Sequence, residues 1–378
     1  MKRNLKICHL TSVHHRDDIR IFKKQCVSLA EQNNYEVNLI VADNLPDEKT
    51  NGVNIYTVGK DASRLKSIIK TSKRIYKKAL EIDADVYHFH DPELLFVGYF
   101  LKKKKKKVIY DAHEDIPRMV YYKDYIRKPF KRITEIVLES FENFLSKKMD
   151  YIIGATPHIA SRFSKINNAI CVNNYAIFEN KDITERGERI PNEICFVGGI
   201  SWVRGLHNVV KSLPQVEGVK LNLAGNFSDE KYKKEFTSSE GWKKIEYYGL
   251  VDYEKAEEIR KKTSVGIVTY LECEASLTSQ PNKLFEYMAS GLAIVCSNFK
   301  LWKEIVEVNN CGICVDPENI KEIAESIDYL IKNPQIAKKM GENGINAVKS
   351  KYNWSKENEK LQELYQGILN EVLEYSKA

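Results

Sequence analysis

The sequence has no long apolar segment. Its longest uncharged stretches, such as residues 289–299, are about half of the roughly 18 to 20 residues needed to span a bilayer. Near the start, Lys6 and His9 interrupt the place where a secretory signal would have an unbroken apolar core. These absences predict a cytoplasmic protein that does not cross the membrane.

The eight cysteines lack the spacing of a metal site or a disulfide framework. Cys311 and Cys314 form a CxxC pair, but no second pair and no histidine stand at metal-binding spacing. Most of the cysteines lie in segments rich in Val and Ile, such as residues 194–197 and 293–297. We therefore expect small buried apolar side chains, with no chemistry.

Charge is divided unevenly along the chain, whose formal net charge is +7. Residues 1–178 hold 32 basic and 21 acidic side chains, whereas residues 179–378 hold 27 and 31. The excess lies mainly in residues 60–78 and 102–148, which include six consecutive lysines. A solvated surface and an anionic membrane surface both fit this pattern. Nucleic acid is not expected, because the basic runs carry no RNA- or DNA-reading motif.

Short apolar runs alternate with helical patterns along nearly the whole chain, which is typical of a parallel α/β sheet. Helices are expected at residues 19–32, 65–81 and 354–375. Strands are expected at residues 6–10, 36–42, 54–58, 86–90, 107–111, 151–155, 194–197, 220–224, 265–269, 292–297 and 312–315.

A polar stretch at residues 180–192 interrupts this alternation. With 378 residues, two domains are expected. We predict doubly wound, Rossmann-like domains at residues 1–178 and 193–353, with a linker at 179–192. Because such sheets bind ligands outside the carboxyl ends of their strands, the active site is expected in the cleft between the domains.

Residues 195–205 join an apolar strand to a helix through Gly198 and Gly199, and Arg204 and Gly205 open the helix. Glycines let backbone amides approach a phosphate, and a helix start favours anions. A common strand-ending turn with a surface arginine explains the pattern equally well. The segment has neither a GK[ST] ending nor a GxGxxG fingerprint.

Residues 279–291 follow a predicted strand and place Pro281 ahead of a helix that ends at Gly291. Lys283 and Glu286 are three residues apart and share one helix face. The lysine could bind a phosphate and the glutamate could accept two hydroxyl hydrogen bonds. An ordinary surface ion pair explains either residue alone.

Taken together, these segments resemble the donor-binding domain of family 4 glycosyltransferases of the GT-B fold, of the kind found in bacterial surface polysaccharide biosynthesis. In the first half the resemblance rests on residues 6–22, 88–95 and 110–115. In the second half it rests further on residues 223–225 and 247–250, and on residues 352–354, which precede the helix that crosses back onto the first domain in this family.

The resemblance implies transfer of a sugar from a nucleotide diphosphate with retention at the anomeric carbon and no metal, a UDP-sugar being the first expectation. It implies that Arg204 and Lys283 stabilise the diphosphate, that Glu286 binds the ribose and that His113 lies beside the donor sugar. The remaining donor-site residues that it implies are Gly198, Gly199, Gly225, Leu250, Thr278, Asn282 and Leu284.

Two positions depart from the family pattern. Gly199 stands where a basic residue is frequent, and Thr278 stands where the first glutamate of the E-x7-E pair is expected. The donor sugar and its orientation therefore stay open.

In the first half, His113 follows a predicted strand, where a structural histidine would be more common without the resemblance. Asp91 and Glu93 follow another strand and could bind or deprotonate an acceptor hydroxyl, or form a turn. Further candidates on the acceptor side are Arg16, Asp17 and Glu114. The Asp83-Ala-Asp85 motif precedes its strand, so no metal is expected there.

Residues 118–148 combine several tyrosines with a helix whose apolar residues share one face. Core packing is the expected role of that face, and an interfacial role is kept for the preceding loop. The members of the face are Phe130, Ile133, Ile136, Val137, Phe141, Phe144 and Leu145.

The sequence thus predicts a metal-independent retaining glycosyltransferase with a lipid-linked or glycan acceptor, active at the inner face of the membrane in cell-surface polysaccharide biosynthesis. Its partners would be the nucleotide sugar, the acceptor and anionic lipid. The alternatives are a non-hydrolysing nucleotide-sugar 2-epimerase of similar fold and a non-catalytic protein that binds a nucleotide sugar or anionic lipid. The oligomeric state is not predicted.

Overall fold

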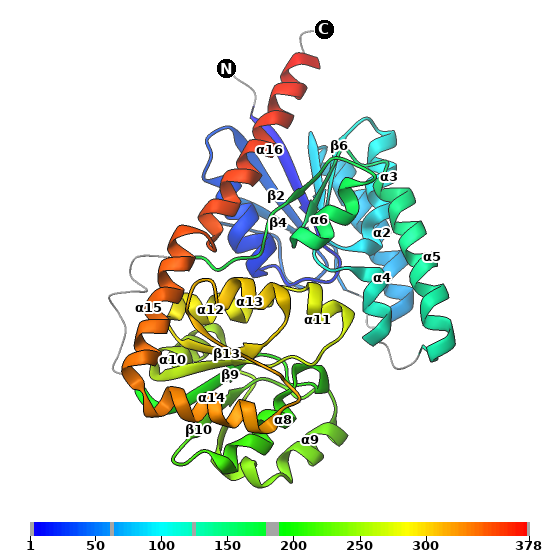
Figure 1. Cartoon of the computed structure of the whole chain (residues 1–378). Helices are drawn as coiled ribbons and strands as arrows, with labels where there is room; N and C mark the ends of the chain where they lie inside the picture. Colours follow the sequence, from blue (N-terminus) through cyan, green and yellow to red (C-terminus); the bar gives the residue numbers. More distant parts are fainter. Residues whose placement is uncertain (1–3, 61–63, 123–125, 179–188, 376–378) are drawn as a thin grey trace. The chain divides into compact units, whose positions relative to one another are not determined.

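The computed structural model describes residues 4–60, 64–122, 126–178 and 189–375 (Figure 1). The chain forms two compact units, one comprising Met1–Asn174 with Trp354–Ala378 and the other Tyr175–Asn353. Within the described residues, no helix combines the length and the apolar character that crossing a bilayer requires.

The first unit contains an eight-stranded sheet with the order β3-β4-β2-β1-β5-β6-β7-β8. Its strands pair in parallel, except that β3 and β4 are antiparallel. The strands are β1 (Leu5–Leu10), β2 (Tyr35–Val41), β3 (Glu48–Thr50), β4 (Val53–Thr57), β5 (Val86–Phe89), β6 (Lys107–Ala112), β7 (Tyr151–Gly154) and β8 (Ala169–Cys171).

Helices cover both faces of this sheet. The first unit contains η1 (Ile19–Cys26), α1 (Val27–Ala30), α2 (Arg64–Ile82), η2 (Pro92–Leu94), α3 (Leu95–Lys103), α4 (Ile116–Met119), η3 (Val120–Tyr122), α5 (Lys128–Ser146), α6 (Pro157–Ser164) and α16 (Trp354–Tyr375). One core joins the sheet to η1, α1 and α16, and the other joins it to α2, α3 and α6 (Figure 1). Alternate side chains of each strand therefore enter different cores.

The second unit contains a six-stranded sheet with the order β11-β10-β9-β12-β13-β14, in which every pair is parallel. Its strands are β9 (Ile190–Val197), β10 (Lys220–Ala224), β11 (Ile245–Gly249), β12 (Thr263–Val268), β13 (Ala293–Ser297) and β14 (Gly312–Val315). Its helices are η4 (Trp202–Arg204), α8 (Leu206–Ser212), η5 (Leu213–Gln215), α9 (Glu230–Thr237), η6 (Glu240–Lys244), α10 (Tyr253–Lys262), α11 (Glu274–Thr278), α12 (Asn282–Ser290), α13 (Lys300–Val306), α14 (Ile320–Lys332) and α15 (Pro334–Ser350).

Two cores again lie on opposite faces. Ile194 and Phe196 of β9 enter the core with α8, α9 and α14, whereas Cys195 enters the core with α10, α12 and α13. The predicted α/β class with doubly wound parallel sheets is confirmed, and α16 belongs to the first unit.

The predicted strands lie within a few residues of the observed ones. Strands β3, β8 and β11 were not predicted, because they are short or only partly buried and lack a strong apolar run. The first unit ends at Asn174 rather than at residue 178. Tyr175 packs against Phe285 and Tyr352 of the second unit in tilted and edge-on arrangements, with ring centroids 4.5 and 5.4 Å away. Of the predicted linker, residues 179–188 lie outside the described residues, and residues 190–192 begin β9.

The prediction for the apolar face of residues 128–146 was wrong. Leu145 is buried, but the other six apolar residues of that face are 43% to 63% exposed. The physical reason is that α5 turns a different face, containing Glu135 and Glu142, toward the sheet.

Candidate active site

Two glycines of the second unit meet where β9 and β10 end. Both have backbone angles that favour glycine, with φ of 135° at Gly198 and 139° at Gly225. A Cβ atom on Gly225 would lie 1.9 Å from the Gly198 carbonyl oxygen, and one on Gly198 would lie 2.9 Å from Nζ of Lys283. Gly199 is exposed, and a Cβ there would meet nothing within 4 Å. Glycine thus keeps the space beside the lysine ammonium free of side chains.

Arg204 and Lys283 lie against the same aromatic ring. The Arg204 guanidinium is 4.1 Å from the centroid of Tyr270 and Nζ of Lys283 is 5.5 Å from it. Lys283 also lies 3.7 Å from the centroid of Phe196 and is only 9% exposed. Neither cation forms an ion pair with a described residue. Burial, and then the positive charge of Arg204, lowers the pKa of Lys283. A negatively charged ligand bound here would favour the protonated form of the lysine.

Glu286 follows Lys283 by one helical turn but is far more exposed. Its side chain is 37% exposed, and Oε2 lies 3.6 Å from Nη1 of Arg260. Arg260, on α10, is itself buried. A carboxylate oriented by an arginine and open to solvent can accept hydrogen bonds from hydroxyl groups.

The remaining donor-site candidates have mixed surroundings. Thr278 donates its hydroxyl hydrogen to the Glu274 carbonyl oxygen at 3.1 Å. Asn282, the first residue of α12, and Leu250, after β11, are exposed. Leu284 is fully buried, so its side chain belongs to the core. The roles of these residues stay predictions.

In the first unit, strand alternation gathers polar side chains on one face of the sheet. His9 pairs in register with His88, and Phe89 pairs with Tyr110, so His90 and Asp111 lie near the same edge. These histidines and the aspartate are all buried. Because side chains repeat every two residues along a strand, they form one cluster at the carboxyl ends of β1, β5 and β6.

Asp111 carries the negative charge of this cluster. Nε and Nη2 of Arg20 lie 3.2 and 2.7 Å from its two carboxylate oxygens, and Gln25 donates from Nε2 at 2.7 Å. Burial opposes the charged form, but Arg20 and the surrounding N–H groups hold the pKa of Asp111 well below its usual range. The buried carboxylate is therefore fully compensated within its own unit.

A chain of hydrogen-bonding contacts extends from His113 to the last helix. Its successive distances are 3.1 Å from His113 Nε2 to His90 Nδ1, 2.9 Å from His90 Nε2 to His9 Nδ1, 3.5 Å from His9 Nε2 to the Tyr365 hydroxyl, and 2.9 Å from that hydroxyl to His88 Nδ1. The two ends approach Asp111 Oδ2, with His113 Nε2 at 3.4 Å and His88 Nε2 at 3.8 Å.

The hydrogen bonds of this chain can run in two directions. A neutral imidazole has one N–H group and one lone pair, and a carboxylate can only accept. If His113 donates from Nε2, every later group donates onward and Nδ1 of His113 is left as an acceptor. In the opposite direction Nδ1 of His90, which lies 3.3 Å from Asp111 Oδ2, carries the N–H that points to the carboxylate. In both directions Nδ1 of His113 has no hydrogen bond within the described chain.

Burial keeps the inner histidines neutral. It lowers the pKa values of His9 and His88 well below the usual histidine value, and lowers the pKa of His90 to about 3. His14 lies at the opening of the cluster, its ring 5.1 Å from that of His113. Its pKa is raised, chiefly by its hydrogen bond with Asp18.

The acceptor-side candidates separate into two groups. Asp91 is buried and accepts from Thr11 Oγ1 at 2.9 Å and Ser12 Oγ at 3.1 Å, so it anchors the loop after β1. Arg16 is held by Asp43, with both contacts at 2.8 Å, and by Glu48.

The other acceptor-side candidates are more available to a ligand. Asp17 and Glu114 are exposed. Oε2 of Glu93 is buried and without a partner, and burial raises the pKa of this carboxyl. The roles of all the acceptor-side candidates stay predictions.

Two groups of side chains in the described chain have donor atoms close enough to hold a metal ion, His9 with His88 and His90, and His90 with Asp111 and His113. Their ring nitrogens already contact one another, and Asp111 is paired with Arg20. Hydrogen bonds alone therefore account for both arrangements.

Sequence reasoning missed the residues that support these sites. Tyr270 lies beneath both cations, Arg260 orients Glu286, and Arg20 compensates Asp111. The alternation of His88 with His90 and of Asp111 with His113 was a usable signal, because each pair spans the end of a strand, where residues two apart share a face.

Comparison with known proteins supports this description. Residues 179–347 match the family model described as glycosyl transferases group 1. An uncharacterized glycosyltransferase of Methanocaldococcus jannaschii is 25% identical over 328 residues, which is 79% of each chain. The second unit is therefore similar to group 1 glycosyl transferases over almost its whole length.

Solved structures similar to this chain share its fold at low identity. Sucrose-phosphate synthase from Thermosynechococcus elongatus has a TM-score of 0.74 at 14% identity and covers 97% of this chain and 100% of its own. The Anabaena protein HepE in complex with UDP-glucose has a TM-score of 0.69 at 14% identity, with coverage of 96% and 100%. These neighbours establish the GT-B fold.

Proposed function

We propose that this glycosyltransferase moves a sugar from a nucleotide diphosphate to a lipid-linked or glycan acceptor with retention of the anomeric configuration and without a metal. The observation that carries the proposal is the pair of cations, Arg204 and Lys283, which share the Tyr270 ring and have no counter-ion among the described residues. The leaving diphosphate gains charge as the glycosidic bond breaks, and preformed cations stabilise that charge.

The donor is proposed to be a UDP-sugar. The Anabaena neighbour was solved with UDP and with UDP-glucose, which supports this choice of nucleotide. Glu286 would accept hydrogen bonds from the ribose, because its carboxylate is oriented by Arg260 and open to solvent.

His113 would contact the donor sugar through Nδ1. With the proton of His113 on Nε2, this nitrogen has a lone pair that would accept a hydrogen bond from a sugar hydroxyl. Glu93 is the proposed acceptor-side base, because its buried, unpartnered Oε2 and raised pKa suit a group that takes up a proton.

The proposed setting is cell-surface polysaccharide synthesis at the inner face of the membrane. The positive charge of the first half of the chain supports attraction to anionic lipid, where each lysine or arginine near the surface contributes about 1 kcal/mol.

The test combines donor binding with turnover. Thermal shifts with UDP-, GDP- and ADP-sugars identify the donor, because a ligand that binds the folded state raises Tm. Nucleotide release with a polyprenyl-linked acceptor, and proton NMR of the new glycosidic bond, then test transfer and retention. Conversion of the donor without acceptor would instead indicate an epimerase. Binding without any product would indicate a non-catalytic protein.

A further inference from the structure

Helix α5 has its charged and apolar faces reversed relative to an ordinary surface helix. Glu135 and Glu142 are buried against the first unit. The exposed face holds Phe130, Ile133, Ile136, Val137, Phe141 and Phe144. A surface helix of a globular protein normally turns its apolar stripe toward the core, whereas here the described residues leave a large apolar stripe exposed.

Polar contacts attach the inner face of α5. Glu142 accepts from the Tyr110 hydroxyl at 2.8 Å and from Nη2 of Arg162 at 2.6 Å. Glu135 accepts from the Tyr121 hydroxyl at 2.8 Å. Because these contacts hold the helix, its outer phenylalanines are not required to fix it in place.

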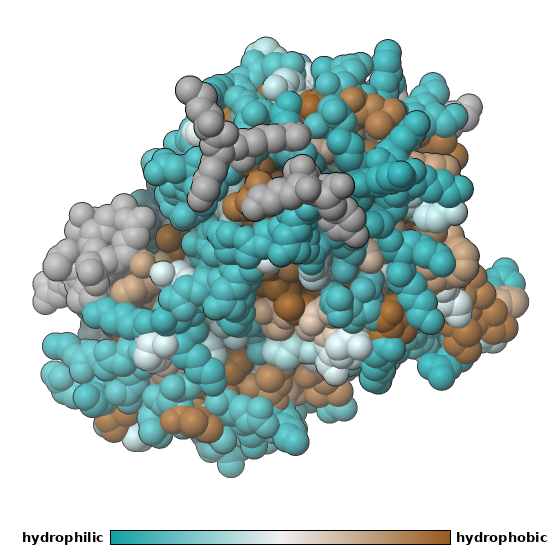
Figure 2. All heavy atoms as spheres, turned by 90° about the horizontal axis from the view of Figure 1, so that it is seen from above, coloured by the Kyte–Doolittle hydropathy of each residue, from teal (hydrophilic) through white to brown (hydrophobic). Residues whose placement is uncertain are grey.

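The apolar surface continues onto α3. Phe96 and Phe100 are also exposed, and the Phe96 ring lies 5.5 Å from the Phe141 ring between centroids. We call the exposed apolar residues of the two helices the α3–α5 face. Figure 2 shows brown apolar atoms gathered along the right-hand side of a mostly teal view, the side on which Figure 1 places α5.

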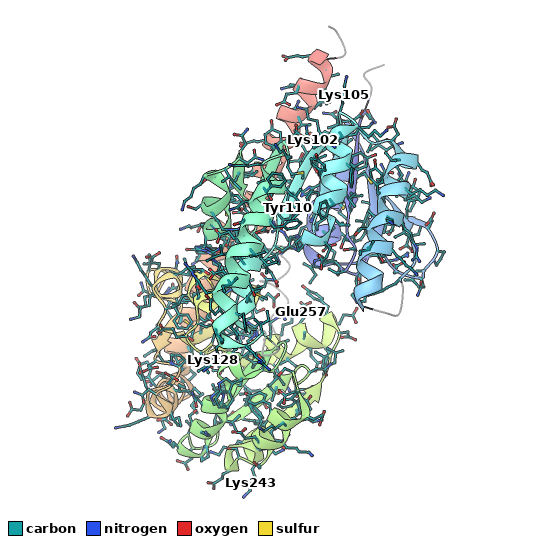
Figure 3. All side chains as sticks on the ribbon, turned by 90° about the vertical axis from the view of Figure 1, so that its right-hand side faces the viewer. Lys102, Lys105, Tyr110, Lys128, Lys243 and Glu257 are labelled. Atoms are coloured by element: carbon teal, nitrogen blue, oxygen red, sulfur yellow. The ribbon has the colours of Figure 1, made fainter. Side chains whose placement is uncertain are left out.

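Basic residues border the α3–α5 face at both ends. Figure 3 shows Lys128 at one end of α5 and Lys102 and Lys105 near the other. Lys147 and Lys148 are exposed just after α5, and Nζ of Lys148 lies 5.9 Å from the centroid of the Phe144 ring.

No acidic side chain of α5 is exposed. Glu135 and Glu142 are buried, and Glu139 lies 2.7 Å from Nη1 of Arg118. The exposed charges along this helix are therefore all positive.

We propose that the α3–α5 face docks the enzyme onto an anionic lipid bilayer, with its phenylalanines in the headgroup region and its lysines on lipid phosphates. Apolar residues between cations match the two components of such a surface. A second copy of the chain would bring like charges together at a self-complementary interface, and a nucleic acid would leave the phenylalanines exposed. The proposal deepens the membrane location in the proposed function, but it is tested without donor or acceptor.

The main test is cosedimentation of the full chain with vesicles of phosphatidylcholine alone or with added phosphatidylglycerol. Binding is expected only to the anionic vesicles, and to fall as salt rises from 0.1 to 1 M, since the Debye length shrinks from about 10 to about 3 Å. Phe141→Ser/Phe144→Ser should lower the partition coefficient at least tenfold. Replacing Lys103, Lys104 and Lys105 by Gln should lower it about fivefold per lysine.

Val308→Ser/Tyr329→Ser is the matched control, because both side chains are exposed apolar groups of the second unit. It should bind vesicles as the wild type does. The α5 double variant should keep its Tm, and should keep wild-type turnover on a water-soluble acceptor, which separates failed docking from failed transfer.

Three outcomes would overturn the proposal. The first is absence of wild-type binding to anionic vesicles at low salt, and the second is equal binding by the α5 double variant. The third is light scattering that shows a dimer which the double variant converts to monomer while neither protein binds vesicles.

Discussion

The two units treat buried charge in opposite ways. In the first unit, the Asp111 carboxylate is buried with Arg20 beside it and histidine rings around it. In the second unit, Lys283 is buried beside Arg204, and neither forms an ion pair with a carboxylate of the described residues. An uncompensated buried cation is destabilising, and a bound anion removes that penalty. The cations of the second unit are thus placed to bind an anion, whereas the buried carboxylate of the first unit is already paired with Arg20.

The two units also differ in net charge. The first unit holds 35 basic and 26 acidic side chains, and the second holds 24 and 26. Because the buried charges of the first unit are compensated, its surplus lies on its surface, where it can attract a partner.

The largest expected effect is acid lability of the first unit. His9, His88 and His90 have lowered pKa values, so the unfolded chain takes up protons below about pH 6.5 that the folded chain does not. Stability should therefore fall as pH drops from 7 to 5, by up to about 1.4 kcal/mol per pH unit for each histidine.

The test is the protection of backbone amides from hydrogen exchange between pH 7 and 5, corrected for intrinsic exchange rates. Strands β1 and β5 of the first unit should lose protection, compared with β9 and β12 of the second. The second unit has one comparable group, His207, whose pKa burial lowers to about 4. Equal loss of protection in both units would contradict the histidine explanation.

The second prediction removes the charge of the buried carboxylate. Asp111→Asn leaves Arg20 buried without a counter-ion and should cost about 3–5 kcal/mol of unfolding free energy in urea. Asp43→Asn is the matched control, because Arg16 and Asp43 form the same kind of pair with more exposure, and should cost less than about 1 kcal/mol. Similar losses in both variants would show that burial does not set the strength of the pair.

The third prediction separates activity from stability in the second unit. Lys283→Met should reduce transfer by about 10²–10³-fold, because a positive group that stabilises the leaving diphosphate is lost. Its Tm should stay level or rise, since an unpaired buried charge is removed. Lys300→Met, at the exposed first residue of α13, should leave both unchanged. Wild-type turnover in Lys283→Met would contradict the assignment of Lys283 to the diphosphate site.

The fourth prediction concerns proton uptake at the same lysine. Because the pKa of Lys283 is lowered in the free protein, a bound diphosphate favours the protonated form and raises that pKa. Affinity for UDP should therefore weaken as pH rises through the pKa of the free protein. Calorimetry in two buffers of different ionisation enthalpy should show that UDP binding is accompanied by proton uptake. The Lys283→Arg variant should show no such uptake, because arginine stays protonated.

The smallest expected effect is that of chelation. Transfer should survive EDTA, because Arg204, Lys283 and backbone amides take the role that a divalent ion plays elsewhere. Loss of activity that added Mg²⁺ or Mn²⁺ restores would contradict this prediction. It would show that Arg204 and Lys283 do not replace a divalent ion.

The sequence by itself determined the fold class and most of the strands. Runs such as residues 265–268 and 293–296 are apolar on both faces, and only a covered parallel sheet buries both. It also placed Arg204 and Lys283 in one site, through the resemblance of residues 195–205 and 279–291 to the donor-binding domain of family 4 glycosyltransferases.

The tertiary structure alone decided which charges are compensated and which face of α5 is exposed. The pairing of Arg20 with Asp111 joins residues 91 positions apart, and Tyr270 receives two cations from different helices. The apolar periodicity of residues 128–146 correctly predicted a helix, because periodicity determines which residues share a face. The prediction that the apolar face is buried was wrong. Which face meets the sheet depended on partners elsewhere in the chain, Tyr110 and Arg162 for Glu142, and those contacts form only in the folded unit.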